Sequence, residues 1–221
     1  MTTTIHYREV EVRTDGALLR GDLRIPGVPC GIVLFAHGSG SGRLSPRNRY
    51  VAERLNDKGL ATLLLDLLTE EEERVDAQTG QLRFDIGLLT DRLSGATNWL
   101  KTDADLRGYP VGYFGASTGA AAALAASVRH PSAVQAVVSR GGRPDLAEAI
   151  LGRVTAPTLL IVGSLDDVVI QLNEEALEGI NSEVALEIVP GASHLFEEPG
   201  KLEEVSKLAG NWLQSYLCRG G

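Results

Sequence analysis

The sequence of 221 residues contains only two cysteines, Cys30 and Cys218, and no cluster of cysteine and histidine with the spacing of metal ligands. Two cysteines so far apart do not make the dense pattern of a disulfide-stapled domain. We therefore expect both cysteines to be free thiols in a reduced, cytoplasmic protein. We expect no bound metal.

The chain also lacks a long apolar run and an excess of basic residues. No apolar stretch approaches the roughly 20 residues that a membrane-spanning helix needs. Residues 1–6 show no basic region followed by an apolar one, so no secretory signal peptide is expected. Lysine and arginine total 21 against 29 aspartate and glutamate, a formal net charge of −8. Nucleic acids and anionic membranes attract basic surfaces, so the charge argues against both as partners.

Local patterns predict defined elements near the start of the chain. A hairpin of two strands is expected over residues 5–13 and 17–25, with Asp15-Gly16 as the turn between them. Ser45-Pro46 predicts a helix start, because serine is a favoured N-cap and proline suits the first helical position. The polar segment 69–81 is predicted as a surface loop or short helix whose acidic residues face solvent.

From residue 31 onward, predicted strands and helices alternate. This order is typical of an α/β protein with a mostly parallel, doubly wound sheet, here with the antiparallel hairpin at one edge. The length favours a single domain over residues 1–221, with no linker. The predicted strands are 31–36, 60–65, 109–114, 134–139, 157–162 and 184–189, and the predicted helices are 46–58, 84–101, 118–130, 145–151, 172–180 and 201–217.

One short motif leads to a functional hypothesis. Residues 115–119 read Gly-Ala-Ser-Thr-Gly, after an apolar strand-like run and before an alanine-rich helix. The pattern G-x-S-x-G in this setting is typical of a nucleophile elbow, a sharp strand-to-helix turn that exposes a serine hydroxyl. The alternative is an ordinary strand-turn-helix junction rich in small residues. We predict that Ser117 is a catalytic nucleophile.

A glycine-rich loop at residues 37–42 follows the first predicted parallel strand. Ligands of such sheets bind at the carboxyl ends of the strands, where this loop and the elbow meet. We predict that the backbone N–H groups of Ser39 and Thr118 hold a developing oxyanion, with the glycines flanking Ser39 as alternative donors. A dinucleotide-binding fingerprint is disfavoured there, because its last glycine is replaced by arginine.

Two later segments supply a carboxylate and a base. Residues 163–169 contain Asp166 and Asp167, either of which can orient a catalytic imidazole. His194 lies in a loop beyond the last predicted strand, and a serine hydroxyl needs such a base because it is a poor nucleophile at neutral pH. The chain order serine, acid, histidine is that of the α/β-hydrolase fold and differs from the orders in chymotrypsin and subtilisin.

With these residues in place, the chain resembles the α/β-hydrolase superfamily and, within it, the dienelactone-hydrolase-like family. The resemblance spans nearly the whole chain, from residues 37–38 through the elbow to the loop of His194. It implies a fold without a large cap domain, and it favours Asp166 because the family places the acid three residues after the glycine. Dienelactone hydrolases proper use a cysteine nucleophile where this chain has Ser117. The resemblance therefore implies a serine esterase rather than lactone specificity.

The predicted reaction is hydrolysis of a small carboxylic ester or related acyl substrate, with no metal or organic cofactor. Ser117 is the nucleophile, His194 the general base and Asp166 the residue that orients it. Two alternatives stay open. The same triad can transfer the acyl group to an alcohol, thiol or peroxide, as an acyltransferase or perhydrolase does, and the fold can also serve a non-catalytic ligand-binding protein.

Three arginines are predicted near the catalytic edge of the sheet. Arg43 and Arg47 follow the glycine-rich loop, and Arg140 follows the strand at 134–139. The planar guanidinium fork suits a carboxylate. We predict that Arg140, or next Arg43, binds an anionic group of the substrate; the alternative is that these are solvated surface arginines.

Overall fold

In the computed structural model, which describes residues 4–14 and 16–218, eight strands of the described chain form one sheet in the order β1-β2-β4-β3-β5-β6-β7-β8. Strands β1 and β2 form an antiparallel hairpin, and β2 also pairs antiparallel with β4. The other pairs are parallel, which confirms the predicted α/β sheet with an N-terminal antiparallel hairpin. Of the predicted turn Asp15-Gly16, Asp15 lies outside the described residues. The strands are β1 (Ile5–Thr14), β2 (Ala17–Pro26), β3 (Gly31–Ala36), β4 (Leu60–Leu65), β5 (Val111–Ala116), β6 (Val134–Arg140), β7 (Thr158–Gly163) and β8 (Val184–Val189).

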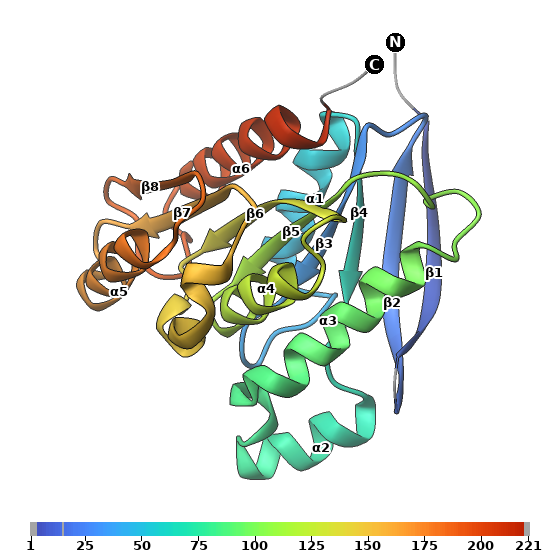
Figure 1. Cartoon of the computed structure of the whole chain (residues 1–221), viewed down its shortest axis with the longest axis horizontal. Helices are drawn as coiled ribbons and strands as arrows, with labels where there is room; N and C mark the ends of the chain where they lie inside the picture. Colours follow the sequence, from blue (N-terminus) through green and yellow to red (C-terminus); the bar gives the residue numbers. More distant parts are fainter. Residues whose placement is uncertain (1–3, 15, 219–221) are drawn as a thin grey trace.

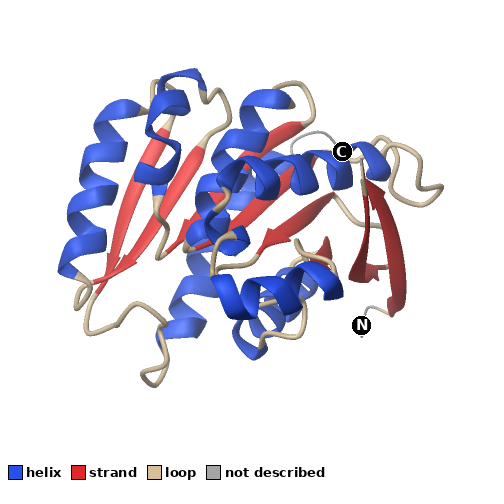
Figure 2. Ribbon diagram, turned by 90° about the horizontal axis from the view of Figure 1, so that it is seen from below, coloured by secondary structure: helices blue, strands red, loops and turns tan. Residues whose placement is uncertain are grey.

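Helices cover both faces of this sheet (Figures 1 and 2). Helices α1 and α6 pack on one face, and α3, α4 and α5 pack on the other, giving two apolar cores. None of the helices in the described part of the chain is long and apolar enough to cross a membrane. The helices are α1 (Pro46–Asp57), α2 (Glu70–Thr79), α3 (Ile86–Leu100), α4 (Thr118–Arg129), α5 (Asp167–Gly179) and α6 (Lys201–Leu217), with 3₁₀ segments η1 (Leu82–Phe84) and η2 (Pro144–Arg153).

The central strands are apolar throughout because both faces are covered. Every residue of β3, β4, β5 and β7 is buried, as expected for parallel strands between two helical layers. Strand β5 starts and ends two residues later than predicted. Its ladder runs from Val111, opposite Ile32, to Ala116, opposite Arg140, so part of the elbow motif belongs to the strand.

Helix boundaries follow local capping. Ser45 caps α1 as predicted, accepting a hydrogen bond from the N–H of Asn48 at 3.4 Å. The segment predicted as a loop or short helix forms α2, because Thr69 and Glu72 make a reciprocal capping box. Helix α5 begins five residues earlier than predicted, with Asp166 at its N-cap position. In Figure 1, α2 lies at the lower end of the molecule, beyond α3.

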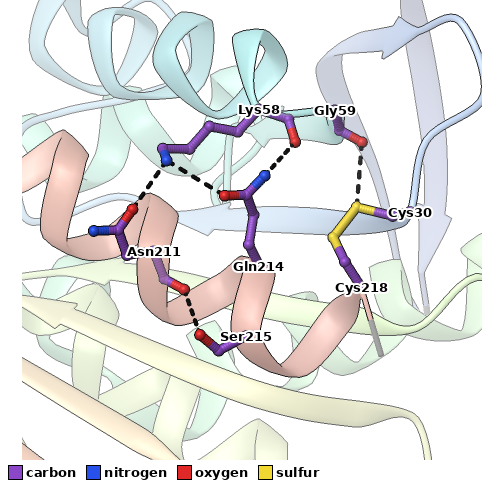
Figure 3. The surroundings of a disulfide bond; sticks show 7 residues. All are labelled: Cys30, Lys58, Gly59, Asn211, Gln214, Ser215 and Cys218. Carbon is purple, nitrogen blue, oxygen red and sulfur yellow. Dashed lines mark hydrogen bonds between the residues drawn. A yellow bond between two sulfur atoms is a disulfide. The ribbon is translucent and has the colours of Figure 1, made fainter. Parts of the chain in front are cut away.

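The expectation of two free thiols is wrong, because Cys30 and Cys218 form a disulfide (Figure 3). Sequence separation hid their proximity: the end of α6 returns to the start of β3, and the two Cα atoms are 5.0 Å apart. The same region is held by Gln214, whose side-chain amide donates to the backbone carbonyl of Lys58 at 2.7 Å. The cytoplasmic expectation, which rested on free thiols, loses that support.

The two glycines of the G-x-S-x-G motif allow α4 to approach the strands closely. A Cβ on Gly119 would lie 2.1 Å from the carbonyl oxygen of Ala36, and one on Gly115 would lie 2.5 Å from the Cα of Ala120. Both contacts are with backbone, which cannot rotate away. The motif is therefore required by packing as well as by the turn.

Gly119→Ala is expected to destabilise the fold by about 1–3 kcal/mol or more, because α4 must move off β3 to admit the methyl group. Gly179→Ala is the matched control: it also lies in a helix, its added Cβ would meet nothing closer than 3.5 Å, and it should be neutral or mildly stabilising. Urea denaturation midpoints provide the measurement. Equal midpoints for the two variants would contradict the close approach.

Candidate active site

Ser117 occupies the turn between β5 and α4 and has a backbone conformation that residues other than glycine rarely adopt. Its φ is 50° and its ψ is −121°. The strain, which costs about 1–3 kcal/mol, is maintained by the surrounding backbone. The N–H of Ser117 donates to the carbonyl of Arg140 at 3.2 Å, and its own carbonyl accepts from the N–H of Arg143 at 3.1 Å. This is the geometry of a nucleophile elbow.

His194 is paired with Asp166 rather than with Asp167. The Nδ1 atom of His194 lies 2.6 Å from Oδ2 of Asp166. Asp166 stands at the N-cap position of α5 but makes no capping hydrogen bond, so its carboxylate is available to the imidazole. Asp167 is exposed in the first turn of α5. With Nδ1–H donated to a carboxylate, the neutral ring presents Nε2 as a base.

The acid turn and the histidine loop are packed against each other. A Cβ on Gly163 would lie 2.2 Å from the carbonyl oxygen of Ala192, and the N–H of Leu165 donates to that carbonyl at 3.0 Å. The backbone of Gly141 also borders the site: a Cβ there would lie 3.4 Å from Nδ1 of His194. Gly141 follows Arg140, whose carbonyl accepts the N–H of Ser117. The backbone of residues 140–141 therefore borders both Ser117 and His194.

The glycine-rich loop lies against the elbow. A Cβ on Gly38 would lie 3.0 Å from the Cβ of Ser117 and 3.1 Å from the carbonyl of Ala116. The hydroxyls of Ser39 and Thr118 lie 3.2 Å apart. The structure therefore brings the two residues predicted to hold the oxyanion together, next to Ser117.

The buried side chain of His37 links the glycine-rich loop to the segment that follows β4. Its Nδ1 lies 3.0 Å from the carbonyl oxygen of Gly38, and its Nε2 accepts the backbone N–H of Leu67 at 3.0 Å. Both bonds form together only when the ring is neutral with its proton on Nδ1. Burial lowers the pKa of His37, and this effect outweighs the opposing ones of the Gly38 carbonyl and Asp66.

Arg43, the second predicted anion-binding residue, lies in an ion-pair network. Its Nη1 is 3.0 Å from Asp22, its Nε is 3.0 Å from Asp66, and its backbone N–H donates to Asp66 at 2.7 Å. Burial alone would lower the pKa of Arg43, but the two carboxylates raise it above its usual value. Arg49 adds a second bond to Asp22 at 3.0 Å. The network anchors the end of the glycine-rich loop to β2 and to the end of β4.

Arg140, by contrast, has no partner among the described residues. It is only 7% exposed, and its Nε and Nη1 atoms are buried without a hydrogen bond. Burial, aided by the positive charge of Arg47, lowers its pKa to about 10. Asp166 and His194 are thus brought together directly, the backbone of residues 140–141 borders both Ser117 and His194, and Arg140 ends β6 next to Ala116.

A cleft of about 590 Å³ opens beside the glycine-rich loop. The sequence did not predict the outer wall of this cleft, which is formed by α2 and the turn that follows it. The capping box at Thr69 and Glu72 was the signal that could have identified this helix. Among the described residues, no group of three or more histidine, cysteine, aspartate or glutamate side chains is arranged to hold a metal ion. The missed wall residues are Glu73, Asp76, Ala77 and Arg83.

Residues 25–215 match the family model described as the dienelactone hydrolase family. The chain belongs to this family. A crystal structure of a dienelactone hydrolase from Anabaena variabilis superposes with a TM-score of 0.94 at 58% identity, covering 96% of this chain and 98% of that one. The fold also matches that of Est1E from Butyrivibrio proteoclasticus, with a TM-score of 0.78 at 15% identity over 94% of this chain and 98% of that one. The chain therefore has the α/β-hydrolase fold of this family.

Two curated relatives from Mycobacterium tuberculosis strains carry the name Putative phosphoribosyl transferase. Each is 57% identical to this chain over 213 residues, which are 96% of this chain and 47% of the relative. The chain thus spans about half the length of the curated relatives it matches.

The buried imidazole of His37 makes stability depend on pH. The folded state lowers its pKa below the ordinary 6.5, so the unfolded chain binds more protons in acid. The neutral ring of His37 contributes its full stabilisation above about pH 6.5. As the pH falls toward the lowered pKa of the folded state, this stabilisation is lost by at most about 1.4 kcal/mol per pH unit. In urea denaturation from pH 7.5 to 5, His37→Asn should show a shallower loss than the parent. Parallel profiles would contradict the neutral, hydrogen-bonded ring.

Proposed function

We propose that this protein is a serine hydrolase that cleaves small carboxylic esters or related acyl substrates through an acyl-enzyme. The observation that carries the proposal is that the backbone of residues 140–141 borders both Ser117, which is held at positive φ in the elbow, and His194, which pairs with Asp166 at 2.6 Å. Membership in a hydrolase family supports it. The three residues supply the nucleophile, the base and the group that orients the base.

In the first half-reaction, the hydroxyl oxygen of Ser117 attacks the substrate carbonyl while its proton passes to Nε2 of His194. Asp166 keeps Nδ1 protonated, so only Nε2 is free to take the proton, and its charge stabilises the imidazolium. The tetrahedral intermediate then collapses. His194 returns the proton to the departing alkoxide, and the acyl group stays on Ser117.

The second half-reaction repeats these steps with water. His194 takes a proton from the water molecule, whose oxygen attacks the acyl carbonyl, and then returns it to the oxygen of Ser117. The acid is released and the serine is restored. The N–H groups of Ser39 and Thr118 stabilise both tetrahedral oxyanions, and the two residues lie side by side, with their hydroxyls 3.2 Å apart.

Hydrolysis is preferred to phosphoribosyl transfer for this chain. The curated relatives named for that transfer are about twice as long, and the segment they share with this chain is the one that matches a hydrolase family. Ser117 replaces the cysteine of dienelactone hydrolases proper. We therefore propose simple esters, rather than lactones, as substrates, with water as the acyl acceptor.

Ser117→Ala and His194→Ala should each lower kcat by roughly 10³-fold or more on 4-nitrophenyl esters of graded acyl length. Because the residues act as a unit, the double variant should be little slower than either single one. The chain length at which the parent is fastest would define the size of the acyl site. If the decrease in kcat in the double variant equals the product of the two single decreases, the assignment of a triad is contradicted.

Asp166→Asn should lower kcat by about 10²- to 10⁴-fold, because the amide no longer holds the proton on Nδ1 of His194. Asp167→Asn is the matched control, one residue away and exposed. It should change kcat by less than about threefold, while removing a helix N-terminal charge worth about 0.3–1 kcal/mol of stability. The reverse ranking in kcat would move the acid by one residue.

A further inference from the structure

Asn173 is a buried amide on α5 that takes no part in the steps described above. Its side-chain nitrogen donates to the carbonyl of Val169, one turn back on the same helix, at 2.8 Å and to the carbonyl of Gly142 at 3.0 Å. Both neighbours are carbonyl oxygens, which only accept, so the NH₂ group must face them. Its Oδ1 atom is buried without a hydrogen-bond partner, which is unfavourable. The two donated bonds are therefore what the amide contributes, and the bond to Gly142 is the one that leaves the helix.

Gly142 is the middle residue of the short segment 141–143, which connects β6 to η2. On one side of it, Gly141 borders the ring of His194. On the other side, the N–H of Arg143 donates to the carbonyl of Ser117 at 3.1 Å. Residues 141–143 therefore contact both the elbow and the base, and Asn173 bonds to the centre of this segment.

The helix that carries Asn173 also carries the acid. Asp166 stands at the N-cap position of α5 and pairs with His194 at 2.6 Å. Asn173 follows Asp166 by seven residues, about two helical turns, so both lie on one side of the helix. The bond from Asn173 to Gly142 thus ties the helix of the acid to the segment that contacts the elbow.

We propose that Asn173 is a positioning residue of the reaction, because its hydrogen bond to Gly142 sets the placement of the Ser117 turn relative to the pair of Asp166 and His194. This inference rests on the proposed function and deepens it. A displacement of about 1 Å between reacting groups can lower a rate by about 10²-fold. The described residues that line the cleft come from 37–47, 66–89 and Thr118. Asn173 therefore acts on kcat, while KM depends on residues that it does not contact.

The chain contains a matched control in Asn56, a second buried amide at the end of α1. Its side-chain nitrogen also donates two hydrogen bonds, to the carbonyl of Leu60 at 2.9 Å and to the hydroxyl of Thr62 at 3.1 Å, and its Oδ1 is also buried without a partner. Leu60 begins β4, so Asn56 lies at the amino edge of the parallel strands, opposite the catalytic edge. Asn173→Leu and Asn56→Leu therefore make the same chemical change at opposite ends of the sheet.

Both variants should lower the urea midpoint, because each leaves a buried acceptor without its donor. On 4-nitrophenyl esters, Asn173→Leu should lower kcat by about 10- to 100-fold with KM changed by less than about twofold, whereas Asn56→Leu should change kcat by less than about twofold. Asn173→Ser serves if the leucine variant does not fold: its hydroxyl can still donate to the carbonyl of Val169 but is too short for Gly142, so kcat should again fall. Unchanged kcat in a folded Asn173 variant, or equal losses at Asn173 and Asn56, would overturn the proposal.

A double variant distinguishes positioning from a general loss of structure. If Asn173 acts by placing Ser117 against His194, its replacement has little left to disturb once the imidazole is gone. Adding Asn173→Leu to His194→Ala should therefore lower the residual kcat by less than about threefold. A further loss as large as that in the parent background would show that Asn173 acts independently of the base and would contradict the proposal.

Amide hydrogen exchange of residues 141–143 separates this inference from the proposed function, because it needs no turnover. Exchange at Gly141 and Arg143 should be faster in Asn173→Leu than in the parent and unchanged in Asn56→Leu. Faster exchange in a protein without ester turnover would uphold the tie between α5 and the segment and refute the proposed function. Ester turnover that depends on Ser117, with neither kcat nor exchange responding to Asn173, would uphold the proposed function and refute the positioning role.

Discussion

The close approach of α4 to the strands is the constraint on which the rest of the site depends. Gly119 lets the helix backbone come within contact of the end of β3, and Gly115 lets β5 lie under the first turn of the helix. Between them Ser117 is held at a φ of 50°, a conformation that costs about 1–3 kcal/mol and is compensated by the fully buried alanines of α4. The same geometry directs the N–H groups at the start of α4 toward the catalytic edge.

Charge is distributed unevenly around that edge. The glycine-rich loop is anchored by Arg43 between two aspartates, and the imidazole of His194 has its own carboxylate. In both arrangements the polar groups have partners within the protein. Arg140 alone, among the arginines discussed, is buried with no counter-ion among the described residues, at the end of β6 where its carbonyl accepts the N–H of Ser117.

Much of this was predictable from sequence, because the signals were local. Buried strands are continuous apolar runs, Ser45-Pro46 begins a helix, and the order of Ser117, Asp166 and His194 indicated the fold. The residues themselves left Asp166 and Asp167 open, and only the family resemblance favoured Asp166, since the distinction depends on which carboxylate faces His194 in space. The Cys30–Cys218 disulfide could not be anticipated, because it depends on where α6 ends in space. The unpaired state of Arg140 could not be predicted either, because it depends on all the side chains that surround this residue in the fold.

The most direct test of the central claim is the reaction with a fluorophosphonate, followed by peptide mapping. A serine activated by His194 and Asp166 should take up one label per chain, on the peptide that contains Ser117, with loss of esterase activity in proportion. In His194→Ala the labelling rate should fall by about 10³-fold, because the hydroxyl has lost its base. A parent protein that hydrolyses esters while Ser117 stays unlabelled, or that labels equally fast without His194, would contradict the account.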